Sequence, residues 1–320
     1  MSHVIELTDE QYEAYPSPYF ILYAVADGVY AAISTPGTGT LGNAGIVDLG
    51  DATLVFDTFM SLSPARELLR AAERLIDKPV RYVVNSHYNA DHINGNQVFP
   101  DAVIISTQGT RDLIATRGMK IMEEMRAHPE YPDEIAAQLA QAQDERTRRS
   151  LEIDLADTRA LAASLPELEL RLPSITFDDR LVVHGLHRTV ELLTFGAGHT
   201  DSDGFMLIPD VKVAFLGDLL FNKAHPSLWA DRPDGWIDTL SKIERMDIAT
   251  VIPGHGQIGT LADVWALREY WEEMRALAET LAQRGASADE IAKTPIPDAY
   301  AEWEWPENYT QTLAKLARHD

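Results

Sequence analysis

The segment SHYNADHINGN, residues 86–96, places the strongest constraint on what this 320-residue chain can fold into. It contains two histidines, one aspartate and three asparagines, and it comes just after the apolar run Val80–Val84. A short apolar run of this kind is typical of a buried β-strand. We therefore expect a sheet in which this strand delivers a loop rich in metal-binding side chains.

The spacing within this segment groups its polar side chains. In an extended chain alternate side chains point the same way, so His87 and Asn89 face one point in space. After a turn, Asp91 and His92 face a second point close to the first. Imidazole nitrogens and carboxylate oxygens are ligands for zinc, iron and manganese. The alternative is a polar turn that caps a helix, with Asp91 or Asn94 as the cap.

Composition limits the class of protein and the chemistry of any metal site. With 45% hydrophobic residues the chain can bury a large core, and its net charge of −23 argues against nucleic acid or an anionic membrane as a partner. It has no cysteine, which leaves histidine and carboxylate as the charged or strongly coordinating metal ligands. The expected partner is a small-molecule substrate.

The N-terminal residues 1–16 include acidic residues and lack the basic start and apolar core of a signal peptide. No apolar run reaches the length of about 18 residues that suggests a transmembrane helix. We therefore expect a cytoplasmic protein.

The order of the predicted elements indicates a layered α/β domain. Strands are expected within residues 19–58, then a helix over residues 64–77 that starts after Ser63 and Pro64, and strands over residues 79–84 and 101–107. Residues 109–165 are predicted to form a helical insertion, uninterrupted between residues 133 and 164. Such an insertion serves as a lid, as a dimer surface, or only as surface helices.

Strands return after the insertion, within residues 174–200, 212–221 and 249–256, with a helix at residues 236–246 between the last two. Residues 261–320 form a predicted C-terminal helical part. We expect a single domain over residues 1–320, and we consider a homo-oligomer, with the insertion and the aromatic C-terminal tail as the surfaces to test.

Four segments place a histidine or an aspartate at the end of a predicted strand: HYNADH at residues 87–92, GAGHTDSD at 196–203, FLGDLLF at 215–221 and IPGHG at 252–256. In this order they resemble the metallo-β-lactamase superfamily, whose pattern is HxHxDH followed by a histidine, a bridging aspartate and a histidine. The resemblance covers residues 44–256 and implies a four-layer αββα sandwich with the site at one edge.

Carried over residue by residue, the resemblance implies two metal sites. The first takes His87, the position of Asn89, and His199. The second takes Asp91, His92 and His255, and Asp218 bridges the two.

This chain departs from the family pattern at Asn89, which stands where the second histidine of HxHxDH is expected. An amide oxygen is a weaker zinc ligand than imidazole, so the first site should hold its metal more weakly or prefer a harder ion. Three cases stay open: two metals with Asn89 as ligand or water anchor, one metal at the second site, or an iron or manganese pair. Zinc is the first expectation.

The predicted function is a metal-dependent hydrolase in which a metal-activated water attacks a small ester, lactone or amide. Asp91 is expected to orient the nucleophile and to pass a proton to the leaving group. Tyr88 is a candidate hydrogen-bond donor to the substrate, with packing as the alternative. His225 is a candidate proton donor or replacement imidazole, with a turn cap as the alternative.

Several supporting roles are also predicted. Asp57 is expected either to hydrogen-bond a ligand histidine or to be a turn residue, and Trp229 to contact substrate in a partly apolar pocket built with the insertion. Thr200, Asp201 and Ser202 are expected to brace their loop. The remaining histidines are interpreted as surface residues: His3, His128, His184, His187 and His319.

Two other functions remain open. One is a di-iron redox or oxygen-handling protein of the same fold, and the other is a ligand-binding protein with a degraded metal site. The complete ligand set of the second site argues against the latter.

Overall fold

The computed structural model describes residues 15–143 and 145–318 and contains two β-sheets. The first sheet holds seven strands in chain order: β1 (Phe20–Ala26), β2 (Val29–Ser34), β3 (Ala44–Asp48), β4 (Thr53–Phe56), β5 (Val80–Val84), β6 (Val103–Thr107) and β7 (Ile175–Phe177). The pairs from β1 to β4 are antiparallel and those from β4 to β7 are parallel. Parallel neighbours need a crossover, and helix α1 (Leu62–Leu75) supplies the one between β4 and β5.

The second sheet has the order β12-β11-β10-β9-β8. Its strands are β8 (Arg180–His184), β9 (Thr189–Gly196), β10 (Asp203–Ile208), β11 (Val213–Asn222) and β12 (Thr250–Gly256). The last two are parallel, and helix α7 (Asp234–Ile243) lies in the connection between them.

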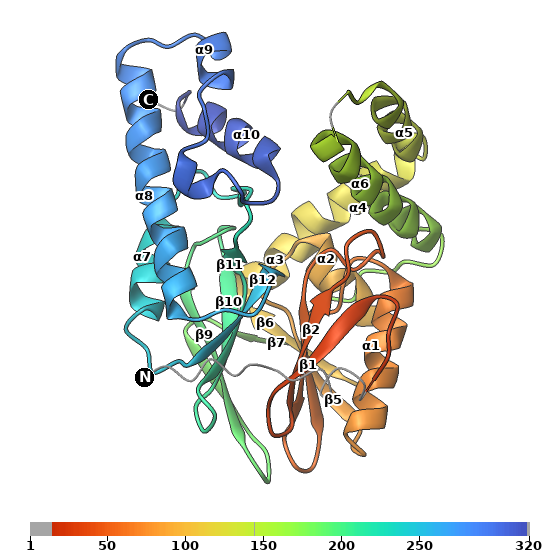
Figure 1. Ribbon diagram of the computed structural model, residues 1–320. Helices are drawn as coiled ribbons and strands as arrows, with labels where there is room; N and C mark the ends of the chain where they lie inside the picture. Colours follow the sequence, from red (N-terminus) through yellow and green to blue (C-terminus); the bar gives the residue numbers. More distant parts are fainter. Residues whose placement is uncertain (1–14, 144, 319–320) are drawn as a thin grey trace.

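The two sheets face each other across a shared apolar core. Val47 and Phe56 of the first sheet belong to the same buried cluster as Met206 and Phe215 of the second. Helix α1 covers the outer face of the first sheet, and α7 with α8 (Leu261–Gln283) covers the outer face of the second (Figure 1). This arrangement confirms the predicted αββα sandwich. The predicted start of α1 was two residues late, because Ser61 is the N-cap.

A helical insertion arm leaves the first sheet after β6 and returns at β7. It contains α3 (Gln108–Leu113), the π-helical turn η3 (Ile114–Gly118), α4 (Met119–Ala127), α5 (Tyr131–Gln141) and α6 (Glu145–Ser164). The prediction of an unbroken helix over residues 133–164 is wrong, because α5 ends at Gln141 and α6 folds back on it. Ile135 of α5 and Leu155 of α6 are both buried, and tertiary packing of this kind cannot be read from local helix propensity.

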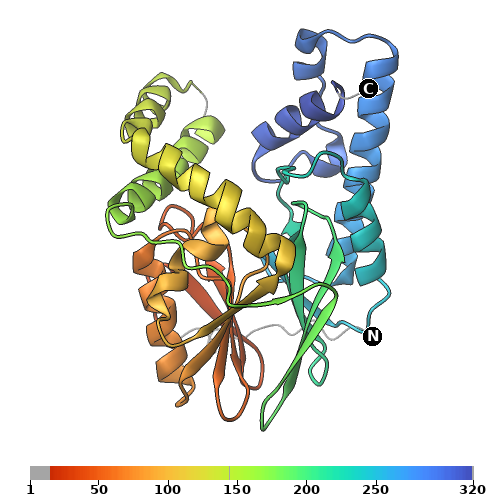
Figure 2. The same cartoon turned by 180° about the vertical axis from the view of Figure 1, so that it is seen from behind.

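The C-terminal arm, residues 284–318, contains α9 (Ala288–Ala292), η4 (Asp298–Tyr300) and α10 (Pro306–Leu316). Both arms rise from the same end of the sandwich, one on either side (Figures 1 and 2). Arg146 of α6 joins them, since its guanidinium donates to the carbonyl oxygen of Trp303 at 2.9 Å. The insertion arm is anchored to the sandwich through Asp157, whose carboxylate accepts hydrogen bonds from the amides of Gly37 and Gly39 at 3.2 and 2.7 Å.

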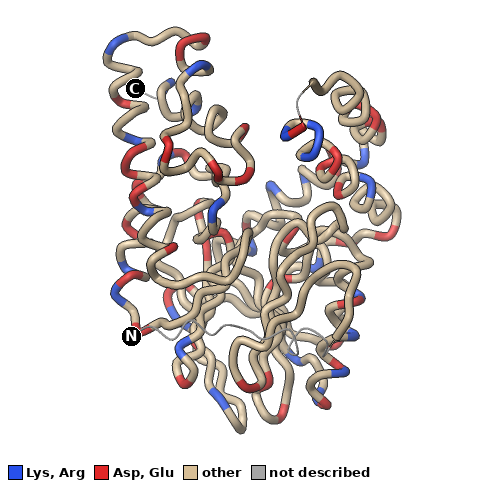
Figure 3. Tube along the Cα trace, in the orientation of Figure 1, with Lys and Arg blue, Asp and Glu red and all other residues tan. Residues whose placement is uncertain are grey.

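Acidic and basic residues are interspersed along the helices of both arms and of α8 (Figure 3). Within the described residues, no helix combines the length and the apolar character that a bilayer crossing requires.

Candidate metal centre

The predicted ligands come together at the end of the sandwich from which the two arms rise. Asp218 lies within β11, and the others come from segments at or near the end of a strand: His87 and Asn89 after β5, Asp91 and His92 on the one-turn helix α2 (Ala90–Ile93), His199 between β9 and β10, and His255 near the end of β12. The 3₁₀ helix η2 (Asn94–Val98) completes the motif. Asp218 was predicted at a strand end, but β11 continues through it to Asn222.

The Asp218 carboxylate lies at the centre of the cluster. Four imidazole Nε2 atoms surround it, at 3.5 Å for His87, 3.1 Å for His92 and 3.3 Å for both His199 and His255. The Asp91 carboxylate lies 3.1 Å from Nε2 of His92 and 3.3 Å from Nε2 of His255. All of these side chains are buried.

Asn89 also points into the cluster. Its amide nitrogen lies 3.3 Å from Nε2 of His199, and its amide oxygen is buried without a hydrogen-bond partner. The two ends of an amide are assigned from their surroundings, so either orientation presents one polar atom to His199 and leaves the other to a ligand.

The chemistry of this donor set fits a divalent metal. Among the described residues, eight buried side-chain polar atoms lack a hydrogen-bond partner, and six of them belong to the predicted ligands: His87, Asn89, Asp91, His92, Asp218 and His255. Leaving such an atom unpaired costs about 1–3 kcal/mol. A cation bound in the cluster would remove that cost for all six except Nδ1 of His255, because Nε2 of that ring is the atom that faces the cluster. Two groups have ligand atoms within 4.8 Å of one another: His87, His92 and Asp218, and Asp91, His92 and His255.

Asp57 contacts the ring nitrogen of His92 that faces away from the cluster. This agrees with its predicted role as a hydrogen-bond partner of a ligand histidine. Its carboxylate lies 2.8 Å from Nδ1 of His92 and accepts hydrogen bonds from the amide and the hydroxyl of Ser86 at 2.8 and 2.7 Å. These contacts orient Nε2 of His92 toward the cluster. Asp57 adopts a φ of 55°, which is unusual for a residue other than glycine and marks local strain at the site.

Two glycines let the backbone approach the ligands closely. A Cβ atom at Gly42 would lie 2.7 Å from Cε1 of His92. A Cβ atom at Gly254 would overlap the Asp218 carboxylate itself. Asn43 holds the same segment, because its side-chain amide donates to the carbonyl oxygens of Pro253 and Gly256 at 2.9 and 3.0 Å.

The four histidines experience different electrostatic environments. Burial lowers the pKa of His87 well below its usual value, and it lowers the pKa of His199 to about 4. Burial also acts on His92 and His255, but there the neighbouring carboxylates outweigh it and raise the pKa. His87 and His199 are thus neutral in this arrangement, whereas the surroundings of His92 and His255 favour positive charge.

The structure does not bring His225 into this cluster. Its ring lies 3.3 Å from the hydroxyl of Tyr270 and 3.2 Å from the carbonyl oxygen of Tyr300, and it packs against Trp303 and Tyr309. The prediction that His225 replaces the missing imidazole or supplies a proton is therefore wrong in its geometry. The aromatic residues of the C-terminal arm close around this histidine and bury it completely.

Tyr88 is buried, and Trp229, which is 45% exposed, packs edge-on against it with ring centroids 6.3 Å apart. The loop after His199 is braced as predicted: Thr200 donates from its amide and hydroxyl to Asp203 at 2.9 and 3.0 Å, and the hydroxyls of Ser202 and Thr107 are 2.7 Å apart. Burial raises the pKa of Asp203 to about 7.

Of the histidines interpreted as surface residues, His128, His184 and His187 are exposed. His3 and His319 lie outside the described residues.

Trp305 is a residue of the site that the sequence analysis missed. Its ring packs edge-on against His255, with ring centroids 5.0 Å apart, and against Phe221. It belongs to the C-terminal arm and lies fifty positions after the histidine that it contacts. The sequence shows that the C-terminal tail is aromatic. The spacing of these residues does not predict which strand the tail contacts.

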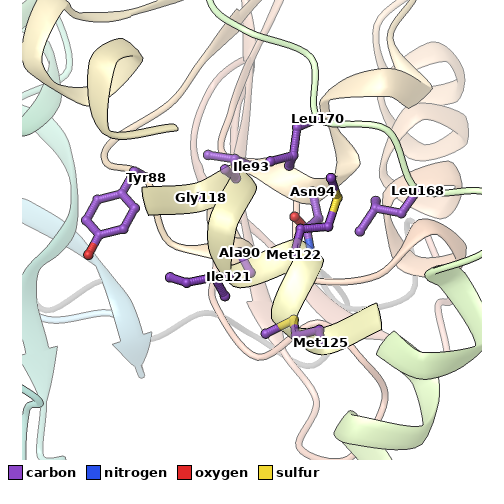
Figure 4. Close-up of a pocket in the computed structure, with 10 residues that line it drawn as sticks. All are labelled: Tyr88, Ala90, Ile93, Asn94, Gly118, Ile121, Met122, Met125, Leu168 and Leu170. Atoms are coloured by element: carbon purple, nitrogen blue, oxygen red, sulfur yellow. The ribbon is translucent and has the colours of Figure 1, made fainter. Parts of the chain in front are cut away.

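An apolar pocket lies behind the metal-binding loop, with a volume of about 300 Å³ that includes its open mouth. Met122, Met125 and Leu168 line one side, and Tyr88 extends away from them on the other (Figure 4). In the motif, Tyr88 and Ala90 alternate with His87 and Asn89. The pocket formed by the insertion arm therefore lies behind the loop rather than over the metals, and Trp229 is not part of its lining.

The αββα sandwich and the candidate metal centre agree with the comparison with known families. The family model described as the metallo-beta-lactamase superfamily matches residues 37–255, which is more than half of the chain. The chain belongs to this superfamily, whose members are mostly hydrolases and usually bind divalent metals.

Solved structures show the same fold. The metallo-beta-lactamase from Pontibacter korlensis matches 79% of this chain and 99% of its own, with a TM-score of 0.55 and 17% sequence identity. The DIM-1 metallo-beta-lactamase matches 80% of this chain and 98% of its own, with a TM-score of 0.57 and 16% identity.

One curated relative is the linear primary-alkylsulfatase of Pseudomonas sp. (strain ATCC 19151), 23% identical over 230 residues. The match covers 66% of this chain and 41% of that enzyme, so the chain spans less than half of the relative's length.

Proposed function

We propose that this protein is a metal-dependent hydrolase that acts on a small ester, lactone or amide through a metal-activated water. The observation that carries the proposal is the convergence of four imidazole nitrogens on the Asp218 carboxylate, with buried ligand-type atoms of His87, Asn89, Asp91, His92 and Asp218 left without a hydrogen bond. The alkylsulfatase relative adds alkyl sulfate esters to the substrates that deserve testing.

A bound divalent cation would lower the pKa of a coordinated water toward about 7 and polarise the substrate oxygen. The protein's own side chains fix the geometry of that reaction. Oδ2 of Asp91 lies between Nε2 of His92 and Nε2 of His255 without a well-formed hydrogen bond to either. From this position the carboxylate could accept a proton from water and return it to a leaving group. Burial excludes competing water from these contacts and strengthens them.

We propose zinc as the metal, in a binuclear site with two unequal halves. The first half consists of His87, Asn89 and His199, and the second half consists of Asp91, His92 and His255. Asn89 supports this inequality, because an amide oxygen replaces an imidazole in the first half. An oxygen ligand also makes iron or manganese reasonable occupants of that half.

The proposal is tested by metal analysis of the purified protein together with a substrate panel: 4-nitrophenyl acetate, γ-butyrolactone, a simple anilide and a primary alkyl sulfate. Asp91→Ala should lower kcat by about 10²–10⁴-fold on any substrate that the protein hydrolyses. Asp101→Ala, which removes an exposed aspartate outside the site, is the matched control and should be unchanged.

Full activity in Asp91→Ala would remove this aspartate from the reaction. A protein without metal and without activity on the panel would contradict the proposal as a whole.

A further inference from the structure

Four side chains lie beside the metal ligands without belonging to them: Tyr88, Arg117, Asp201 and Trp229. Tyr88 stands between His87 and Asn89 in the chain, and Asp201 is two residues after His199. The backbone amide of Trp229 donates to the carbonyl oxygen of His199 at 2.9 Å. These residues therefore flank the first half of the site.

Arg117 belongs to the π-helical turn η3 of the insertion arm. Such turns are uncommon and occur frequently at functional sites. Its guanidinium pairs with the Asp201 carboxylate at 3.1 Å, and both side chains are about half exposed, at 51% and 49%. An ion pair this exposed contributes only about 0–1 kcal/mol, so a competing anion can take the place of Asp201 at little cost.

The hydroxyl of Tyr88 supports a ligand at this position. It is buried, and it makes no hydrogen bond of good geometry in the structure. The guanidinium of Arg117 lies close enough to this hydroxyl for the two side chains to interact. A buried hydroxyl without a well-formed hydrogen bond, next to a half-exposed guanidinium, is a pair of donors suited to an oxyanion.

Trp229 supplies a flat apolar wall on the other side of Tyr88. Its ring is 45% exposed and meets the Tyr88 ring edge-on. A large exposed aromatic ring next to a buried polar group is typical of a surface that packs against part of a ligand.

We propose that Arg117, positioned by Tyr88 and Asp201, recognises an oxyanion group on the substrate, while Trp229 packs against the adjoining apolar part. This inference rests on the proposed hydrolase function and narrows its substrate class to anionic compounds that carry a carboxylate or a sulfate-like group. Asp201 occupies the guanidinium when no substrate is bound.

Binding of small anions to the protein with its metal tests this inference independently of turnover. Isothermal titration calorimetry with benzoate and with benzenesulfonate distinguishes carboxylate from sulfonate recognition, and neutral benzamide is the reference. Arg117→Gln should weaken binding of the preferred anion about five- to tenfold, since it removes a charge-assisted hydrogen bond that is partly screened by solvent. Benzamide binding should not change.

Asp201→Asn should have the opposite effect, because it removes the competing carboxylate, and should tighten anion binding about two- to fivefold. Tyr88→Phe should weaken anion binding less than Arg117→Gln does. Lys120→Gln removes an exposed cation of the same arm, with a side chain 76% exposed, and is the matched control.

Anion affinity within twofold of the unmodified protein in Arg117→Gln would overturn the inference, as would the absence of measurable anion binding. If esters are hydrolysed while Arg117→Gln is unchanged, the inference fails and the hydrolase function stands. If no substrate is turned over while anion binding depends on Arg117, the hydrolase function fails and the anion site stands.

Discussion

The two proposed halves of the metal centre would share Asp218, but the side chains assigned to them have different partners. In the first half, Nδ1 of His87 lies 3.0 Å from the Ser86 hydroxyl, and Nδ1 of His199 lies 2.9 Å from the Ser227 carbonyl oxygen. In the second half, Nδ1 of His92 meets the Asp57 carboxylate, and Asp91 adds a further carboxylate. Neutral partners support one half and negative charges support the other.

This difference supports the proposal that the cluster offers two metal sites of unequal affinity. Carboxylates beside an imidazole increase its basicity and stabilise a bound cation. They already raise the pKa of His92 and His255 against the effect of burial. We therefore expect the second half to bind its metal first and to retain it longer.

The largest effect on metal binding is expected from Gly254→Ala. This substitution should disrupt both halves and so remove the difference in metal affinity between them. The added Cβ atom would overlap the Asp218 carboxylate that they share. Metal content measured by inductively coupled plasma mass spectrometry should fall to near zero in the folded protein, with apparent affinity lowered by more than about 100-fold. Circular dichroism verifies that the variant is folded.

Gly118→Ala is the control for this substitution, since its nearest neighbour outside the adjacent backbone is 3.8 Å from the added atom. Normal metal content in Gly254→Ala would show that Asp218 can move without loss of the site.

A smaller effect, restricted to the second half, is expected from Asp57→Asn. This change keeps the shape of the side chain but removes the charge that faces His92. The metal affinity of the tighter site should fall about 10–100-fold, so that the affinities of the two halves become more similar. Competition with a chromophoric chelator measures the metal affinity of each half. Asp77→Asn, at an exposed position, serves as the control. An equal loss in both halves would show that Asp57 supports the whole cluster.

Local sequence patterns predicted much of the fold and part of the candidate ligand set. The apolar run at β5 and the motif after it identified His87, Asp91 and His92, because strand periodicity and turn geometry act over a few residues. His199, Asp218 and His255 followed from the family resemblance, since their convergence depends on sheet pairing over more than one hundred residues.

The predictions that failed depended on tertiary packing. The break between α5 and α6 falls in a run of good helix formers, where local propensity gives no sign of it. His225 looked close to the metals by its position after Asp218, but the C-terminal arm folds over it. The same arm brings Trp305 onto His255, a contact that no pattern in either segment indicates.

The inequality of the two halves is tested most directly by calorimetric titration of zinc into chelator-treated protein, with Asn89→His titrated alongside. We predict two binding steps with affinities at least about tenfold apart, and a tighter second step in Asn89→His because an imidazole replaces an amide oxygen. Two equal sites in the unmodified protein, or an unchanged weak step in Asn89→His, would contradict the assignment of unequal halves centred on Asn89.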